Sequence, residues 1–384
     1  MVFIKRWLKA TSLGILLFAV STWVSAFPGN ADSLTAYAFS LSNPILNQPP
    51  LVSYLPPGNA ITDGKALLRY ALPIDNSEIR KIQKDLEELS DWLRSKRWGP
   101  IKSNIGKIER ILNRSSAKIL AAVPTANQAQ AETLISQLQA ELLPLKEAAE
   151  AQDKEQVWQQ RAAALDTVGA LEELMVEGFP YEVPAEYSHL PQLQGRATVE
   201  FTTNKGTMTA VVDGYSAPVT AGNFVDLVQR GFYDGLEFIR AEDYYVLQTG
   251  DPAGAADGFI DPQTNEYRAI PLEILVQGDD QPIYGATLES LGRYLEDPVL
   301  PFSAFGTLGM ARPGNDVNGG SSQFFFFLFE PELTPAGLNL LDGRYTVFGY
   351  VVDNKEVLDE LTQGDRIVSA KVVDGLENLV TPSA

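Results

Sequence analysis

Cysteine is absent from the 384-residue sequence, and histidine occurs once, as His189. The absence of cysteine excludes disulfide bonds, thiolate metal sites, cysteine nucleophiles and a lipid-anchor cysteine. A single histidine also makes a Ser-His-Asp triad or a multi-histidine metal site hard to build. His189 lies between Pro184 and Pro191, in a stretch that reads as a linker. Most hydrolase chemistries are therefore excluded, and no pattern of residues implies a cofactor.

Basic residues are also scarce, with 30 Lys and Arg against 49 Asp and Glu, which gives a formal net charge of -19. Nucleic acid is therefore not expected as a partner, because binding a phosphate backbone depends on Lys and Arg. The acidic excess is read as a solvated surface that aids solubility, with steering toward a basic partner as the alternative. The chain is long enough for two domains.

The first residues have the pattern of a targeting signal. Lys5, Arg6 and Lys9 precede the short apolar run 13–20, and small residues follow at 24–26. We predict that residues 1–26 are a signal peptide, with an uncleaved anchor as the alternative. The protein is then exported and does not span the membrane after cleavage. Residues 27–63, which are rich in proline, are expected to form an extended lead-in.

Residues 64–178 have a helical pattern. Glycine or proline interrupts it at Gly99-Pro100 and Pro124, and Pro144 is expected to kink or end its segment. Asp75, with Glu78 three residues on, resembles a capping arrangement. The apolar stripe that recurs at spacings of three and four comprises Ile79, Ile82, Leu86, Leu89, Leu93, Ile101, Ile105, Ile108, Leu112, Leu134, Leu138, Leu142, Leu145, Leu165, Val168 and Leu171. These stripes predict an antiparallel helical bundle.

Residues 179–195 contain several prolines and no periodicity, so they are predicted to be a linker. Beyond them the apolar period changes to two, starting with Ala197, Val199 and Phe201. Further strands are expected at 208–212, 305–310, 323–329, 346–352 and 367–373, with a short helix at 218–229. The predicted fold class is thus a multidomain chain, a helical bundle followed by a closed antiparallel β-barrel at 196–376.

Chemistry-bearing motifs lie in this second region. Phe238-Ile239-Arg240 is followed eight residues after the arginine by Gln248, and then by Thr249-Gly250-Asp251. This segment resembles that of cyclophilin-type prolyl isomerases, in which Phe-His-Arg precedes Gln-Gly-Gly-Asp at the same spacing.

Three more stretches resemble cyclophilin motifs in the same order. They are 217–224, 310–325 and 341–349, and the second contains Met310-Ala311-Arg312 and ends in Ser322-Gln323-Phe324-Phe325. Four ordered motifs are a specific signal, whereas any one of them alone is weak.

The resemblance implies that Arg240 and Gln248 are catalytic. Rotation about a peptide bond has a barrier of about 18–20 kcal/mol, which arises from amide resonance. A guanidinium that donates to the prolyl nitrogen favours the non-resonant transition state without a base or a nucleophile. The alternative reading of Arg240 is a surface salt bridge, and that of Phe325 is plain barrel core. The implied substrate-binding residues are Phe238, Tyr245, Val246, Ala311, Arg312, Gln323, Phe325, Leu340, Leu341 and Tyr345.

The chain departs from the family at the rim of the implied pocket. Tyr245 stands where most cyclophilins have Phe, and Leu340 where many have the Trp that contacts cyclosporin. Tyr345, Ile239 and Arg312 replace a His, a His and an Asn. We therefore expect weak cyclosporin binding and reduced isomerase activity.

No metal site is predicted, because the nearby aspartates do not have EF-hand spacing. An acidic, proline-bearing stretch between Glu266 and Pro301 is expected to be a surface insertion.

Signal, bundle, linker and divergent cyclophilin domain together resemble the large cyclophilins of the thylakoid lumen. That resemblance implies a role in folding or assembly of photosystem II proteins, with proline-containing clients as partners and contact between bundle and barrel. Two alternatives stay open. One is an assembly chaperone that binds proline-containing segments with little catalysis, and the other is a general periplasmic isomerase.

Overall fold

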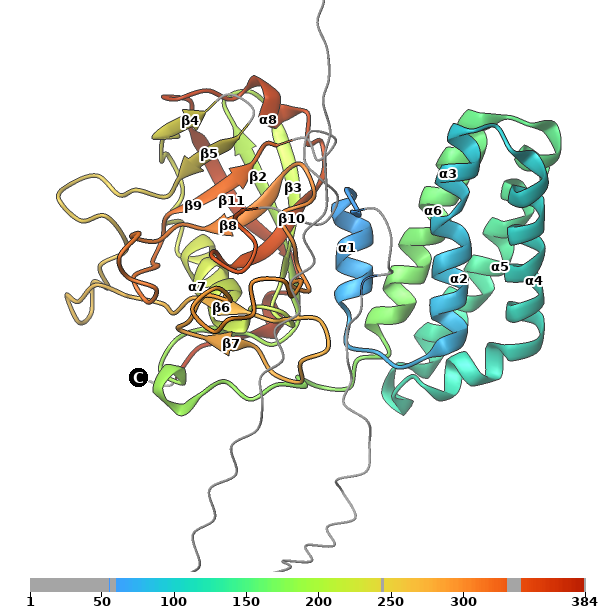
Figure 1. Ribbon diagram of the computed structural model, residues 1–384, viewed down its shortest axis with the longest axis horizontal. Coiled ribbons are helices and arrows are strands. Elements are labelled where there is room, and N and C mark those ends of the chain that lie inside the picture. The colour runs from blue at the N-terminus through green and yellow to red at the C-terminus, as the bar shows by residue number, and fades with distance from the viewer. Residues whose placement is uncertain (1–54, 56–59, 243–244, 330–339, 383–384) are drawn as a thin grey trace, which may run out of the picture. The chain divides into compact units, whose positions relative to one another are not determined.

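The computed structural model describes residues 55, 60–242, 245–329 and 340–382. The predicted signal peptide and nearly all of the lead-in lie outside these residues. Among the described helices, none is long and apolar enough to cross a membrane. Figure 1 shows a set of packed helices and a curled antiparallel sheet.

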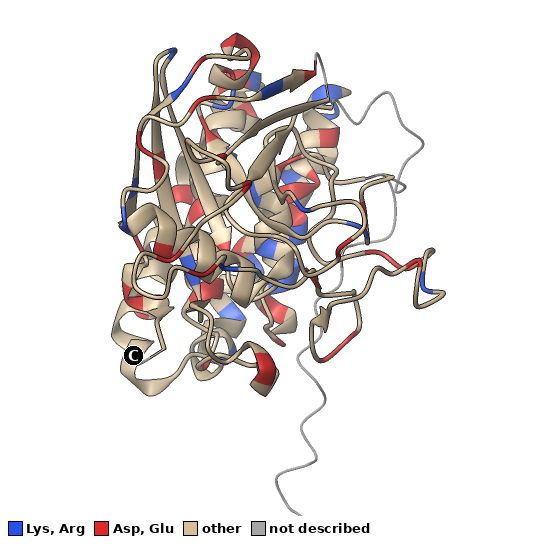
Figure 2. Ribbon diagram, turned by 90° about the vertical axis from the view of Figure 1, so that its left-hand side faces the viewer, with Lys and Arg blue, Asp and Glu red and all other residues tan. Residues whose placement is uncertain are grey.

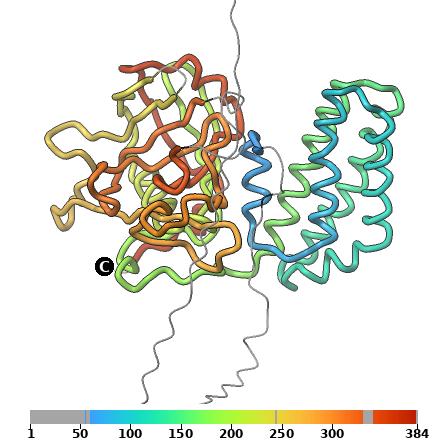
Figure 3. The backbone as a smooth tube through the Cα atoms, in the orientation of Figure 1, coloured from blue at the N-terminus to red at the C-terminus, as the bar shows by residue number. Residues whose placement is uncertain are grey.

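The N-terminal region is helical, as predicted. Its principal helices are α2 (Ser77–Glu87), α3 (Leu89–Arg94), α4 (Trp98–Ala121), α5 (Gln128–Ala151) and α6 (Lys154–Glu173). A short 3₁₀ turn, η1 (Thr125–Asn127), precedes α5. Most of the predicted apolar stripe is buried in one core that these helices share, and Leu134 packs against that core while only partly buried. Figure 3 lets the reader follow the chain from α2 through α6.

The structure corrects two local expectations in the helices, the cap at Asp75 and the end of a segment at Pro144. The N-cap of α2 is Asn76, whose side chain accepts hydrogen bonds from the backbone N–H groups of Glu78 and Ile79. Asp75 is therefore not the cap. Helix α5 also continues through Pro144 and does not end there. The buried side chains of Leu142 and Leu145 flank this proline, and their packing offsets the hydrogen bond that it cannot make.

Helix α1 (Gly64–Ala71) packs against strand β10 (Val347–Asp353). Leu67 and Leu68 are buried in a cluster that also contains Tyr350 of β10. The approach is close, since a Cβ on Gly64 would lie 2.7 Å from the Cβ of Tyr350. The apolar face of α1 therefore belongs to the core of the sheet.

The C-terminal region is built on an eight-stranded sheet in the order β11-β2-β3-β10-β8-β9-β5-β4, with every pairing antiparallel. Besides β10, its strands are β2 (Arg196–Thr203), β3 (Thr207–Asp213), β4 (Arg240–Glu242), β5 (Val246–Thr249), β8 (Thr307–Met310), β9 (Phe324–Phe327) and β11 (Ile367–Asp374). The predicted period of two is visible in β2, where buried and half-buried residues alternate. Helix α7 (Pro218–Gln229) has the predicted bounds and is buried along most of its length.

The predicted closure of this sheet into a barrel is not confirmed. Strands β11 and β4 form its two ends, and no strand ladder joins them in the part of the chain that the structure describes. One isolated bridge, Glu237 with Arg366, links the segments that precede them. The region is thus a curled half-barrel, because the chain before β4 runs beside β11 for only a few residues.

Smaller elements complete the fold. Strand β1 (Gln192–Leu193) pairs with β12 (Leu379–Val380), and β6 (Glu273–Ile274) pairs with β7 (Ile283–Tyr284). Among the described residues, the remaining short helices are η2 (Ala185–Tyr187), α8 (Val357–Glu360) and η4 (Leu376–Asn378). The predicted insertion 266–301 therefore contains a small hairpin of its own.

Candidate active site

The hairpin of β4 and β5 places the two predicted catalytic residues opposite each other. Arg240 on β4 is the register partner of Gln248 on β5, and Gln248 in turn pairs with Phe325 on β9. In an antiparallel ladder, directly opposite side chains lie on the same face of the sheet. The eight-residue spacing seen in the sequence is therefore the length of a hairpin that brings Arg240, Gln248 and Phe325 together.

The guanidinium of Arg240 makes an ion pair with Glu242, two residues on in the same strand. Nε of Arg240 donates to Oε1 of Glu242 at 2.7 Å, and Nη2 donates to the same oxygen. Both side chains are about half exposed, at 51% and 47%. Since Glu242 engages Nε and Nη2, the donors of Nη1 remain for a substrate.

Three polar side chains form a hydrogen-bonded row beside the arginine. Nε2 of Gln248 donates to Oε1 of Gln323 at 2.7 Å. Nε2 of Gln323 donates to Oδ1 of Asp251 at 3.0 Å and to the carbonyl of Asp257 at 2.9 Å. Burial, and then the charge of Asp257, raise the pKa of Asp251. The row fixes the orientation of the Gln248 amide, and in the described residues Gln248 bonds to Gln323 and not to Arg240.

Phe325 forms the apolar floor of the candidate site. Its ring is 6% exposed, and it stacks on Phe302 with centroids 5.8 Å apart and an interplanar angle of 6°. Tyr345 meets the same ring edge-on at 5.8 Å. Gly309 makes room for this arrangement, because a Cβ there would lie 2.5 Å from Cζ of Phe325. The floor is therefore a rigid aromatic surface.

Most of the predicted apolar contacts surround this floor. One apolar cluster contains Phe325 and Val246 among its buried members, and the partly buried residues that pack against it include Tyr245, Ala311, Leu341 and Tyr345. An apolar floor beside a cation suits a proline ring and its peptide nitrogen. The sequence thus predicted residues that the fold does bring together.

Arg312 contacts an aromatic residue of the site, whereas Leu340 lines a separate cavity. Nη2 of Arg312 donates to the carbonyl of Arg344 at 2.8 Å, and its guanidinium lies 5.1 Å from the centre of the Tyr345 ring. Leu340 is 82% exposed and lines a cavity of about 630 Å³ with Leu288 and Tyr294. Arg312 therefore packs against Tyr345, whereas the exposed side chain of Leu340 lies at a cavity whose lining does not include Phe325 or Tyr345.

Phe238 lies apart from these residues. Its ring is fully buried in the main core of the sheet, 6.4 Å from the ring of Phe326. Successive residues of a strand face opposite sides, so Phe326 and Phe325 belong to different faces of β9. The position of Phe238 fits a core role, and we do not include it among the proposed substrate contacts.

Two family models match this chain. One, described as peptidyl-prolyl cis-trans isomerase CYP38-like, PsbQ-like domain, matches residues 63–176, and the cyclophilin type peptidyl-prolyl cis-trans isomerase model matches 198–376. The Synechocystis sp. protein sll0408, whose name is that of a thylakoid lumen peptidyl-prolyl cis-trans isomerase, is 57% identical over 98% of this chain and 96% of its own length. The chain belongs to the cyclophilin-type peptidyl-prolyl isomerase family. The predicted resemblance and enzyme class are thereby confirmed at the level of the family.

Two Arabidopsis thaliana cyclophilins are similar over most of their length. The chloroplastic isomerase CYP38 is 45% identical over 97% of this chain and 85% of its own. The chloroplastic isomerase CYP37 is 32% identical over 90% of this chain and 76% of its own. The similarity therefore covers the helical region and the cyclophilin domain together.

Three residues of this cyclophilin site were missed in the sequence. Glu242 pairs with Arg240, Phe302 supports Phe325, and Gly309 makes space for that ring. The Arg-x-Glu spacing within one strand was the available signal for Glu242, since residues two apart face the same side. No local pattern marks Phe302 or Gly309, because both contacts join segments that are distant in the sequence.

Proposed function

We propose that this cyclophilin isomerises X-Pro peptide bonds in proteins of the thylakoid lumen, with Arg240 and Gln248 as its catalytic residues. The observation that supports this proposal most strongly is the register of β4, β5 and β9. This register places the guanidinium of Arg240 and the amide of Gln248 beside the ring of Phe325. The proline ring would pack on Phe325, and Nη1 of Arg240 would donate to the prolyl nitrogen. Because guanidinium stays charged, the donor is present at any physiological pH.

Gln248 would bind the substrate carbonyl. Its amide is already held by Gln323, so little orientational freedom is lost when the client binds. Tyr245, Val246, Ala311, Leu341 and Tyr345 would exclude water from the prolyl bond, and Arg312 and Leu340 would contact flanking residues. Exclusion of water strengthens the interaction between the arginine and the nitrogen.

The cellular role we propose is folding or assembly of photosystem II proteins after export into the lumen. The relatives support the location, since one is named for the thylakoid lumen and another for the chloroplast. Residues 1–26 would direct the export and then be removed. A general periplasmic isomerase is the alternative in location, and fractionation of the photosynthetic cell separates the two.

A second candidate function rests on the ion pair of Arg240 with Glu242. A carboxylate on the catalytic guanidinium reduces the positive charge available to the prolyl nitrogen. With the altered rim, this arrangement favours a chaperone that binds proline-containing segments and turns them over slowly. Such a protein still binds proline-containing segments, and its function does not require rapid isomerisation.

Complementation distinguishes the two functions. A photosynthetic host that lacks this protein receives either the wild type or Arg240→Ala, and assembled photosystem II is measured. The enzyme predicts that Arg240→Ala restores little assembly at equal protein abundance, whereas the chaperone predicts full restoration. If the wild type also restores nothing, the proposed role in photosystem II is wrong.

A further inference from the structure

The helical region separates charge between neighbouring helices. Helix α4 carries five Lys and Arg and one acidic residue, Glu109. Helix α5, which packs on it, carries one basic and four acidic residues. The whole chain has a net charge of -19, so a basic helix stands out against it. Figure 2 shows how the acidic and basic positions are distributed over the ribbon.

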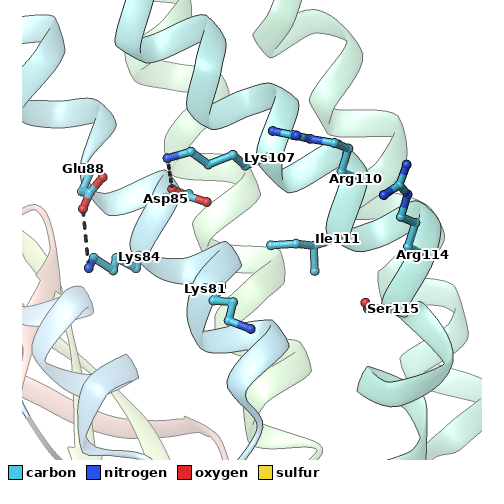
Figure 4. A pocket seen from close by; sticks show the side chains of 9 residues that line it. All are labelled: Lys81, Lys84, Asp85, Glu88, Lys107, Arg110, Ile111, Arg114 and Ser115. Carbon is cyan, nitrogen blue, oxygen red and sulfur yellow. Dashed lines mark hydrogen bonds and ion pairs between the residues drawn. The ribbon is translucent and has the colours of Figure 1, made fainter.

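Three of the five basic residues of α4 line one wall of a groove of about 590 Å³. Lys107, Arg110 and Arg114 come from α4, and Lys81 and Lys84 come from the facing α2 (Figure 4). Asp85 and Glu88 are the two acidic residues of the lining, and Ile111 and Ser115 complete it. Five positive and two negative side chains leave the groove with a formal charge of +3.

The existing ion pairs neutralise only part of this charge. Lys107 lies 3.4 Å from Asp85, and Lys84 lies 3.9 Å from Glu88. Lys81 lies 3.3 Å from Glu78, which is not part of the lining. Nε of Arg110 donates to the carbonyl of Gly106, which carries no charge. Among the described residues, neither Arg110 nor Arg114 has a carboxylate partner, and in Figure 4 the dashed lines reach neither of them. Two guanidinium groups therefore face the groove uncompensated.

We propose that this groove binds an extended acidic segment of a partner protein. Positive side chains stand on both walls, so a chain lying between them is contacted from two sides. Residues three and four apart on a helix are about 5–6 Å from each other. Alternate side chains of an extended chain are spaced by about 7 Å, which is similar. Carboxylates on such a chain can meet Arg110 and Arg114 in turn, with the planar two-donor geometry that arginine gives.

Two other occupants fit the groove less well. A bilayer of anionic lipid presents a flat surface, and it would contact the crests of the helices more than the walls between them. A second copy of this chain is acidic as a whole, and two copies repel each other at long range. Both occupants are outcomes of the test below.

The test measures the anisotropy of a fluorescently labelled oligoglutamate peptide as the full chain is added, with oligoglutamine as the neutral probe. The groove variant carries Lys81→Gln, Arg110→Gln and Arg114→Gln. The matched control carries Lys154→Gln, Lys355→Gln and Lys371→Gln, which remove the same charge from exposed positions elsewhere. Thermal unfolding of each variant is followed in parallel, and the single change Arg114→Gln replaces the triple variant if that unfolds early.

We expect the groove variant to bind oligoglutamate about tenfold more weakly than wild type, because it loses direct charge-assisted hydrogen bonds. The control should bind within about twofold of wild type, because it loses only long-range attraction that salt screens. Isomerase activity should be equal in both variants. Equal loss in groove variant and control would overturn the proposal, as would equal wild-type binding of oligoglutamine. Two further results would contradict the proposal, each with oligoglutamate binding unchanged in the groove variant. In one, the groove variant loses binding to phosphatidylglycerol vesicles. In the other, it loses self-association measured by sedimentation.

Discussion

Replacing Arg196 with alanine removes a buried cation that joins the helices to the sheet. Nε of Arg196 lies 2.6 Å from Oδ1 of Asp213, on the adjacent strand β3. Its Nη1 lies 2.8 Å from Glu173 of α6, and its Nη2 donates to the carbonyl of Leu68 in α1. The side chain of Arg196 is 10% exposed and that of Asp213 is not exposed. One residue thus satisfies groups from three separate segments.

The loss of stability in Arg196→Ala arises because the substitution leaves the carboxylate of Asp213 buried without its partner. Removing one partner of a buried ion pair destabilises a protein by about 3–5 kcal/mol, because the other charge stays buried without compensation. Asp213 keeps one hydrogen bond, from the backbone N–H of Ser216 at 3.1 Å, so the lower part of that range applies. Glu173 is 48% exposed and returns to water at little cost. We expect Arg196→Ala to lower the free energy of unfolding by about 3–4 kcal/mol.

Lys65 supplies the matched control, since it also joins the helices to the sheet. It lies 3.3 Å from Asp353 and 3.6 Å from Asp166, but the three side chains are between 34% and 57% exposed. Exposed pairs of this kind contribute about 0–1 kcal/mol. Lys65→Gln should therefore change the free energy of unfolding by less than about 1 kcal/mol.

Urea unfolding measures both changes. Of the five tryptophans, Trp7 and Trp23 lie in the predicted signal peptide, and Trp92, Trp98 and Trp158 lie in α3, α4 and α6. In a protein that lacks residues 1–26, tryptophan fluorescence therefore follows the helices, whereas near-ultraviolet tyrosine signals also follow the sheet. In the wild type, the unfolding transitions followed by tryptophan fluorescence and by tyrosine signals should coincide. In Arg196→Ala, the two transitions should occur at different urea concentrations. The reasoning is refuted if Arg196→Ala costs no more than Lys65→Gln.

Three further predictions concern the cyclophilin domain. Burial raises the pKa of Glu273 from 4.5 to about 7 against the opposing hydrogen bonds from Thr220 and Val219, so the folded protein holds this proton more tightly than the unfolded chain. The free energy of unfolding should therefore fall between pH 4.5 and about 7. Burial also raises the pKa of Glu172 in α6 to about 7, so Glu273→Gln should reduce this slope in urea titrations without abolishing it; a slope equal to that of wild type contradicts the assignment. Phe302→Ala should lower the free energy of unfolding by about 3–5 kcal/mol in the same assay, and a loss under 1 kcal/mol would show that its ring contacts are dispensable. Gly309→Ala should raise the KM for a proline peptide by displacing the phenyl ring that its Cβ would meet at 2.5 Å, and an unchanged KM would place the pocket elsewhere.

The extent to which sequence predicted structure differed between the two regions. The alternation in β2 was visible because one face of the strand packs on a core, which imposes a period of two on the sequence. The start of α7 was visible because Pro218 occupies its first turn, where proline is favoured. Helix α5 contradicted a local rule, since packing on both sides of Pro144 outweighs one missing hydrogen bond. Local chemistry is therefore decisive only where tertiary contacts do not oppose it.

The candidate site shows the same limit. Arg240 and Gln248 were identified in the sequence by their resemblance to a cyclophilin motif, and the hairpin of β4 and β5 explains the spacing between them. The stacking of Phe302 under Phe325 was not, since it joins residues of two segments that no short motif connects. The curvature of the sheet also depends on the sum of strand twists, so its open edge between β4 and β11 had no local signal.

The most direct test of the account is the rate of cis-trans exchange in a proline-containing peptide, measured by NMR with catalytic amounts of the full chain. Arg240→Ala is compared with wild type and with Arg366→Ala, which breaks the equally exposed pair of Arg366 with Glu237 outside the site. The account predicts exchange above the uncatalysed rate for wild type and for Arg366→Ala, and exchange at background for Arg240→Ala. Equal rates for wild type and Arg240→Ala would contradict a catalytic role of this arginine.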